Sequence, residues 1–214
     1  YMKNNAIFSE YLHEEDQKEI VEGWLSLGDH GYLDELGHLH ILDRQEDVIT
    51  NTDGEIIYPR LVENELKSSP YIQEAVCFGK DKPYMTAILN IDMNSVGRWA
   101  DKNRILYTEY SDLSRNPKVV ELIEQQVEQL MSKLSPQNRV KKFSILHKQF
   151  TADQGELTRT LKIRRNFVEQ KYKILLDGMY SDTQEVSLTS SQMESVEEEV
   201  SLRVIQLKIE QGVA

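Results

Sequence analysis

Two groups of residues in this chain have the types and spacing needed to bind a phosphorylated molecule. In the first, Asp29 follows Gly28 and Arg44 follows Asp43. A carboxylate can accept hydrogen bonds from both hydroxyls of a ribose, and a guanidinium donates to a hydroxyl or a phosphate in a fixed fork. The second group centres on Lys162, whose ammonium can hold an anion where a loop enters a helix with free N–H groups. Both groups therefore point to nucleotide or phosphate chemistry.

Each group also has an ordinary structural explanation. The first could be solvated charges at the ends of a hairpin, because short motifs often match by chance. The second could be a basic, surface-exposed helix start, because runs of charge are usually solvated. However, Arg159, Lys162, Arg164 and Arg165 gather four cations in a chain of net charge −11. That contrast favours a binding role for the second group.

A β-hairpin is expected to position the first group. Two strand-forming runs, 31–34 and 38–42, flank the Gly-containing turn 35–37, and this pattern is typical of a hairpin. Asp29 and Arg44 then lie at the open end of the two strands. The hairpin would present both side chains together.

The rest of the chain alternates between strand-like and helix-like segments. The expected strands are 48–50, 55–58, 72–78, 84–91 and 143–146, the expected helices are 59–67, 93–102, 119–134 and one from 163 onward, and 107–114 is expected to be an irregular loop. Alternation of this kind predicts an α+β domain with a short hairpin and a three-stranded sheet flanked by helices.

The tail from residue 177 differs in composition. Apolar residues alternate with period two at 186–188, at 200–204 and at Ile205, Leu207 and Ile209, and an acidic link spans 189–199. A β-hairpin docked on the sheet is the first interpretation. A disordered link leading into a helix over 197–211 is the alternative, because that stretch also contains good helix formers.

Composition excludes several classes of protein. With a net charge of −11 over 214 residues, the chain lacks the basic surface that binding to nucleic acid requires. No apolar run approaches the roughly 20 residues that span a membrane, and residues 1–5 do not resemble a signal peptide. The single cysteine, Cys77, lies in an apolar run. It is expected to be a buried hydrophobic residue in a reducing compartment.

The pattern from Trp24 to Arg44 reads Trp-x-x-x-Gly-Asp-x-Gly-x-x-Asp-x-x-Gly-x-x-x-x-x-Asp-Arg. It closely resembles the signature of adenylate-forming enzymes, which include acyl-CoA synthetases, luciferases and the adenylation domains of peptide synthetases. The segment 150–165, FTADQGELTRTLKIRR, is most similar to the catalytic-lysine segment of long-chain fatty acyl-CoA synthetases. The resemblance covers roughly residues 1–176.

The resemblance implies a domain organisation. Residues 1–44 would be the end of a large N-terminal adenylation domain, 45–47 a hinge, 48–176 a small C-terminal lid domain, and 177–214 an extension, read above as a β-hairpin. Most of the large domain would be absent, together with the phosphate loop and the acyl tunnel. The isolated fragment is therefore expected to be catalytically silent.

The resemblance also implies roles for individual residues. Asp29 would bind the ribose hydroxyls of ATP or AMP, assisted by Arg44. Lys162 would contact the substrate carboxylate and the α-phosphate during adenylation. Glu46 would be the hinge about which the small domain rotates before thioester formation, and the turn at Gly54 would then line the CoA channel. No residue is assigned to a metal.

The implied reaction converts a fatty acid, ATP and CoA to acyl-CoA, AMP and pyrophosphate through an acyl-adenylate. Its cofactors would be ATP, CoA and Mg²⁺, with Mg²⁺ held by the missing domain or by ATP itself. The parent protein is expected in the cytoplasm, and peripheral contact with the inner membrane stays open. Neither nucleic acid nor a transmembrane segment is expected.

Three positions depart from the family pattern. Leu27 replaces a usual threonine, Glu46 replaces a usual lysine or aspartate at the hinge, and Leu161 replaces a frequent glycine. Leu27 and Glu46 leave one alternative open, and the acid-binding pocket expected in the missing domain leaves a second. One is a degenerate interaction domain without catalysis, and the other is a synthetase for a different carboxylic acid.

Overall fold

The structure is a computed structural model that describes residues 20–22, 24–188 and 200–208. The chain forms two compact units, Tyr1–Val48 and Ile49–Ala214. The predictions for residues 1–5 and for the link 189–199 fall outside the described residues. Within the described part, no helix is both long and apolar enough to cross a membrane.

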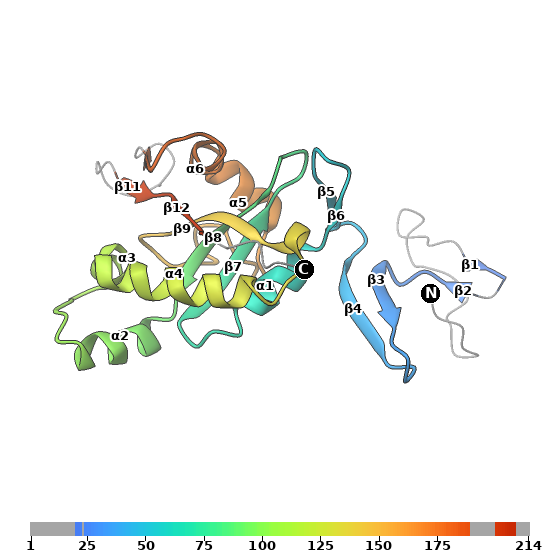
Figure 1. Ribbon diagram of the computed structural model, residues 1–214, viewed down its shortest axis with the longest axis horizontal. Coiled ribbons are helices and arrows are strands. Elements are labelled where there is room, and N and C mark those ends of the chain that lie inside the picture. The colour runs from blue at the N-terminus through green and yellow to red at the C-terminus, as the bar shows by residue number, and fades with distance from the viewer. Residues whose placement is uncertain (1–19, 23, 189–199, 209–214) are drawn as a thin grey trace. The chain divides into compact units, whose positions relative to one another are not determined.

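The helices and strands have the following bounds (Figure 1). In chain order they are β1 (Ile20–Val21), β2 (Trp24–Leu25), β3 (Asp29–Leu33), β4 (Leu39–Arg44), β5 (Ile49–Thr50), β6 (Ile56–Ile57), α1 (Pro59–Leu66), β7 (Ile72–Phe78), β8 (Met85–Ile91), α2 (Met93–Lys102), α3 (Tyr110–Arg115), α4 (Pro117–Met131), the 3-10 helix η2 (Pro136–Asn138), β9 (Val140–Ile145), α5 (Arg165–Lys171), α6 (Lys173–Met179), β10 (Glu185–Leu188), β11 (Val200–Arg203) and β12 (Ile205–Gln206).

In the first unit, β3 and β4 form the predicted antiparallel hairpin. A Cβ at Gly31 would clash with the carbonyl oxygen of His40, so the close approach of the two strands requires glycine there. The turn is held by the Asp34 carboxylate, which accepts hydrogen bonds from the backbone N–H groups of Leu36 (2.9 Å) and His38 (2.8 Å). Together with a hydrogen bond from the His40 ring, these contacts lower the pKa of Asp34.

The second unit is built on a four-stranded sheet in the order β12-β9-β8-β7. Strands β7 and β8 are antiparallel, whereas β8 and β9 are parallel. The sequence predicted these three strands but not the fourth. Strand β12 comes from the tail, where Ile205 pairs with Phe143 at the edge of β9. The alternation at Ile205 and Leu207 predicts a tail hairpin docked on the sheet, but a strand of two residues is too short for the pattern to show that it joins the sheet as a fourth strand.

Helices cover both faces of this sheet (Figure 1). Ala75 and Cys77 of β7 belong to a core cluster shared with α1, α2 and α4, while Val76 and Phe78 belong to a second cluster shared with α5 and α6. Strand β7 is therefore buried on both faces by helices, although it lies at the edge of the sheet and pairs only with β8. Cys77 is 1% exposed, which confirms that it is a buried hydrophobic residue.

Helices α2 and α4 occupy the segments predicted to be helical, but the predicted irregular loop at 107–114 is wrong. Residues Tyr110–Arg115 form helix α3. The Asp112 carboxylate accepts hydrogen bonds from the backbone N–H groups of Thr108 (2.8 Å) and Glu109 (3.1 Å). Satisfying free N–H groups at a helix start stabilises even a short helix.

In the described part of the tail, β10 pairs with β11 in an antiparallel ladder. Four alternating apolar residues of this pair pack into the same cluster as α6; they are Val186, Leu188, Val200 and Leu202. The strand at Val200–Arg203 is incompatible with the alternative helix over 197–211.

His147, which follows β9, makes the stability of the fold sensitive to pH. Burial, reinforced by the positive charges of Arg115 and Lys148, lowers its pKa to about 4 from an ordinary value of 6.5, against an opposing effect of Glu156. The folded chain thus binds fewer protons than the unfolded chain between these pH values, so stability rises with pH across this window.

The free energy of unfolding should fall between pH 7 and pH 4.5, and His147→Gln should reduce that fall. Urea titrations at both pH values test this; equal pH dependence in both proteins would contradict it.

Candidate functional site

Asp29 and Arg44 lie opposite each other at the open end of the β3–β4 hairpin. Their Cα atoms are partners in the ladder, and the Arg44 Nε atom lies 3.2 Å from Asp29 Oδ1. Gly28, with φ +73°, lets the chain enter β3 while its carbonyl accepts a hydrogen bond from Gln45 N–H at 2.8 Å. The side chains of Asp29 and Arg44 are 28% and 47% exposed. Both can reach a ligand while they contact each other.

Glu46 lies in a turn that directly follows β4. The backbone N–H groups of Asp47 and Val48 both donate to the carbonyl of Arg44, at 3.0 and 3.1 Å. The Glu46 side chain is exposed, and the boundary between the two compact units lies two residues later. Glu46 therefore lies at an exposed position of a short turn next to the boundary between the units.

Gly54 occupies the tight turn between β5 and β6. Asn51 organises this turn, because its Oδ1 atom accepts hydrogen bonds from Asp53 N–H (3.0 Å) and Glu55 N–H (2.8 Å). Gly54 has φ +80°, a conformation that favours glycine, and a Cβ there would meet no atom within 4 Å. The backbone of Gly54 is therefore exposed and carries no side chain.

Lys162 lies near the tip of a small hairpin, residues 156–164, that we call the lysine hairpin. Leu157 pairs with Ile163, Thr158 N–H donates to the Lys162 carbonyl (2.8 Å), and the Thr158 hydroxyl accepts from Lys162 N–H (3.0 Å). The prediction of a helix from Ile163 onward is wrong by two residues, because Ile163 is used in this pairing and α5 starts at Arg165. The Lys162 side chain is exposed and its ammonium has no ion pair within the described residues.

Leu161, next to Lys162, carries backbone strain. It has φ +59° and is 72% exposed. The left-handed region costs a residue with a Cβ about 1–2 kcal/mol. Leu161→Gly should therefore be about 1 kcal/mol more stable than Leu161→Ala, which keeps the Cβ. Urea unfolding of the two variants measures the difference, and a less stable glycine variant would contradict the strained backbone.

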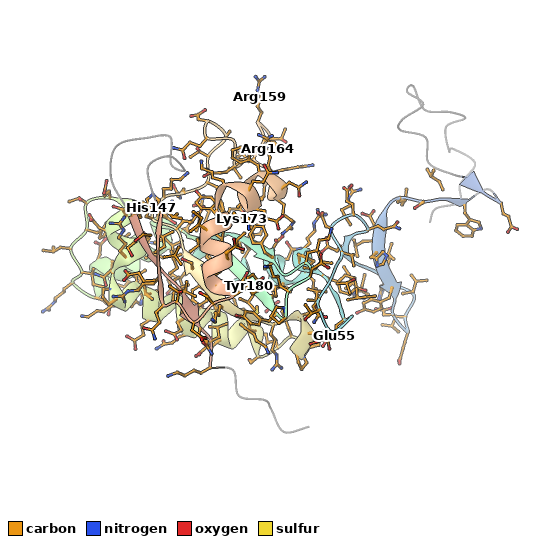
Figure 2. All side chains as sticks on the ribbon, turned by 90° about the horizontal axis from the view of Figure 1, so that it is seen from above. Glu55, His147, Arg159, Arg164, Lys173 and Tyr180 are labelled. Carbon is orange, nitrogen blue, oxygen red and sulfur yellow. The ribbon has the colours of Figure 1, made fainter. Side chains whose placement is uncertain are left out.

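The other cations of this segment have different surroundings. The Arg164 guanidinium donates to the carbonyl of Gly155 (3.2 Å) and lies 5.2 Å from the centre of the Phe167 ring. Figure 2 shows Arg159 pointing away from the helices at the outer end of the lysine hairpin. Arg164 is thus fixed against α5, whereas Arg159 and Lys162 extend into solvent.

Arg165 ties the start of α5 to α1 and β7. Its two terminal nitrogens donate to the two carboxylate oxygens of Glu63, at 2.7 and 3.0 Å, and one of them also donates to the Cys77 carbonyl at 2.7 Å. Glu63 in turn accepts from Cys77 N–H at 2.7 Å. Sequence analysis identified Arg165 only as one of four cations. Its partner lies 102 residues away, so no local pattern could reveal the pair.

Glu156, at the foot of the lysine hairpin, is 0% exposed. Its carboxylate accepts hydrogen bonds from Lys148 (2.6 Å), Tyr172 (2.7 Å) and Thr151 N–H (3.0 Å), and Lys171 lies 3.2 Å away. Burial alone raises the pKa of a carboxyl group, but the hydrogen bonds from Lys148 and Tyr172 outweigh it and lower the pKa of Glu156. Burial and the neighbouring carboxylate raise the pKa of Tyr172. Sequence analysis missed this network.

The structure thus brings Asp29 and Arg44 together in the first unit, and places Gly54 and Lys162 in the second. No group of three His, Cys, Asp or Glu residues that could hold a metal occurs among the described residues. A cavity of about 260 Å³ at the end of β7 is lined by Lys82 and residues of α5 and α6, and not by Lys162. Lys162 therefore lies outside this cavity. The side chains of Arg159, Lys162 and Arg164 are exposed on the surface of the lysine hairpin.

A comparison with protein families decides the classification. The family described as the AMP-binding enzyme C-terminal domain matches residues 46–184. The chain belongs to the AMP-binding enzyme family.

Curated relatives of this chain agree with that classification. It is 31% identical over 183 residues to the long-chain-fatty-acid–CoA ligase FadD15 of Mycobacterium tuberculosis, covering 84% of this chain and 30% of that protein. It is 29% identical to the long-chain-fatty-acid–CoA ligase ACSBG2 of Gallus gallus, covering 89% of this chain and 28% of that protein. The chain thus spans about 30% of the length of the curated relatives that it matches.

Solved structures share the fold of this chain. The adenylation domain of a carboxylate reductase from Mycobacterium chelonae has a TM-score of 0.58 at 21% identity, covering 75% of this chain and 23% of that one. The A-PCP didomain of carboxylic acid reductase from Segniliparus rugosus, solved in complex with AMP, has a TM-score of 0.57 at 18% identity, covering 74% and 21%. The predicted α+β lid fold of adenylate-forming enzymes is confirmed.

Proposed function

We propose that this chain is the C-terminal part of an AMP-forming ligase that activates a long-chain fatty acid as an acyl-adenylate and transfers the acyl group to CoA. The observation that carries the proposal is the lysine hairpin of a domain of this family, which exposes a Lys162 ammonium that has no ion pair among the described residues and which begins at the buried Glu156. The long-chain-fatty-acid–CoA ligases among the relatives support the fatty acid as substrate.

In this proposal Lys162 acts in the first half-reaction. A carboxylate oxygen attacks the α-phosphorus of ATP, the bond to the pyrophosphate leaving group breaks, and acyl-AMP forms. Charge builds between two anions in that transition state, and a positioned ammonium stabilises it. The absence of a competing carboxylate partner for Lys162 within the described residues supports this role.

Asp29 and Arg44 are proposed to hold the nucleotide. The Asp29 carboxylate has the geometry to accept both ribose hydroxyls, while Arg44, 3.2 Å away, donates beside it. A structural neighbour solved in complex with AMP supports an adenine nucleotide as the ligand. ATP would arrive with its Mg²⁺, bound through its phosphates or by the remainder of the protein.

The second half-reaction joins the CoA thiol to the acyl group and releases AMP. We assign Glu46 to the hinge that separates a terminal segment of a large domain (1–44) from a lid domain (48–176), with 177–214 as an extension. Rotation about such a hinge requires only a few residues whose backbone can change. The bare backbone at Gly54 is proposed to line the CoA channel after rotation, because a side chain there would narrow it.

The test is the activity of the full-length protein. AMP release from ATP and CoA should depend on a long-chain fatty acid, and acids of other kinds, such as aryl acids, should support less release. The 214-residue chain alone should release none, because the proposal assigns the phosphate loop and the acid pocket to the remainder of the protein. Preference for an aryl acid would overturn the substrate, and inactivity with every acid would favour a non-catalytic interaction domain. A cytoplasmic location belongs to the same proposal, since the single cysteine, Cys77, is buried and cannot form a disulfide within this chain.

A further inference from the structure

The position of Lys162 depends on a short ladder of hydrogen bonds. At its foot, the Glu156 carbonyl accepts a hydrogen bond from Arg164 N–H (2.9 Å); above it Leu157 pairs with Ile163, and Thr158 pairs with Lys162. The tip beyond this ladder is exposed. The contacts that hold Glu156 and Arg164, at the base of the hairpin, therefore determine the direction in which the Lys162 side chain extends.

The Glu156 carboxylate is the group that fixes this foot. Its hydrogen-bond donors come from three places: Lys148 after β9, Thr151 in the loop before the hairpin, and Tyr172 at the end of α5. Lys171 adds a second cation at 3.2 Å. Through these hydrogen bonds, the fully buried carboxylate connects the start of the lysine hairpin to the segment that follows β9 and to the end of α5.

We propose that Glu156 is a positioning residue that sets the place of the Lys162 ammonium during acyl-adenylate formation. The inference rests on the proposed function. Displacement of a catalytic group by about 1 Å can cost about 100-fold in rate. The Gly54 turn, by contrast, is organised by Asn51 and has no contact with Glu156 among the interactions of the described residues. Loss of the Glu156 anchor should therefore harm the half-reaction that uses Lys162 and spare the half-reaction that uses Gly54.

The experiment compares the two half-reactions in the full-length protein carrying Glu156→Gln. Fatty-acid-dependent exchange of pyrophosphate into ATP should fall about 10- to 100-fold. Formation of acyl-CoA from supplied acyl-adenylate and CoA should stay close to that of the unsubstituted protein. Equal loss in both half-reactions would show a merely structural role, and no loss in either would show that Lys162 does not depend on this anchor. Both results would overturn the inference.

Two tyrosines provide a milder variant and a matched control in case Glu156→Gln does not fold. Tyr172→Phe removes one hydrogen bond to Glu156 and should lower pyrophosphate exchange in the same direction. Tyr180→Phe removes a hydroxyl that contacts Thr86 (3.1 Å) and the Phe78 carbonyl (3.3 Å), away from the lysine hairpin. Tyr180→Phe should change neither half-reaction; selective loss of exchange in it would contradict the inference.

A readout that is independent of activity separates this inference from the proposed function. In the Tyr172→Phe and Glu156→Gln proteins, the amide hydrogens of Lys162 and Arg164 should exchange with deuterium faster, while those of α4 are unchanged. If the unsubstituted protein shows no fatty-acid-dependent exchange of pyrophosphate, the proposed function fails, but this amide result still decides whether Glu156 holds the hairpin. Unchanged hairpin amides would overturn the inference whatever the activity.

Discussion

Lys162→Ala in the full-length protein is expected to slow fatty-acid-dependent adenylate formation about 10²- to 10³-fold, the cost of losing one positioned donor to a transition-state charge. The reason lies in the exposed ammonium, which has no partner within the described residues and so is free to meet two anions. The rate of AMP release under saturating fatty acid, ATP and CoA measures the effect.

Arg159→Ala is the matched control for this variant. Arg159 lies in the same hairpin, is exposed like Lys162, and points outward in Figure 2. Removing it changes the net charge of the segment by the same amount but leaves Lys162 in place. A small effect is expected. If Arg159→Ala were as slow as Lys162→Ala, the rate would depend on the overall charge of the hairpin, and Lys162 would have no special role.

Arg165→Ala is expected to lower the free energy of unfolding by about 3 kcal/mol, near the lower end of the range for breaking a buried ion pair. The pair is bidentate, with the Arg165 and Glu63 side chains only 21% and 11% exposed. Removal of the guanidinium leaves the Glu63 carboxylate buried without its counter-charge and the Cys77 carbonyl without one donor. Urea titration at pH 7 gives the difference.

A more exposed ion pair, between Lys67 at the end of α1 and Glu74 of β7, supplies the control. Lys67 and Glu74 approach to 3.4 Å, but their side chains are 35% and 27% exposed. Water and salt screen such a pair, so Glu74→Ala should cost no more than about 1 kcal/mol. Equal costs for Arg165→Ala and Glu74→Ala would show that Arg165 is not a buried brace between α5 and α1.

The parts of the fold that follow from local patterns could be predicted from the sequence. The β3–β4 hairpin is marked by its Gly-containing turn, and α2 and α4 show apolar residues at helical spacing. Cys77 was correctly placed in the core because it lies within a run of apolar residues. The residues proposed to act on the nucleotide were found because their spacing matches a family signature, and their roles remain proposals.

The parts that depend on distant contacts could not be predicted. Glu63 looks like any helical glutamate until the fold brings it to Arg165, 102 residues later. Glu156 stands between Gly155 and Leu157 in a segment that reads as a polar loop, and only the packing of Tyr172 and Lys148 against it buries the carboxylate. The proposed positioning of Lys162 thus depends on Glu156, a residue that carries no local signal.

The central claim is that this chain belongs to an enzyme that forms an acyl-adenylate. The most direct test is the exchange of labelled pyrophosphate into ATP by the full-length protein, measured without CoA and with or without a long-chain fatty acid. We expect exchange only when the fatty acid is present, because only then can acyl-AMP form and revert. An equal rate of exchange with and without the fatty acid, or no exchange with any carboxylic acid, would contradict acyl-adenylate formation.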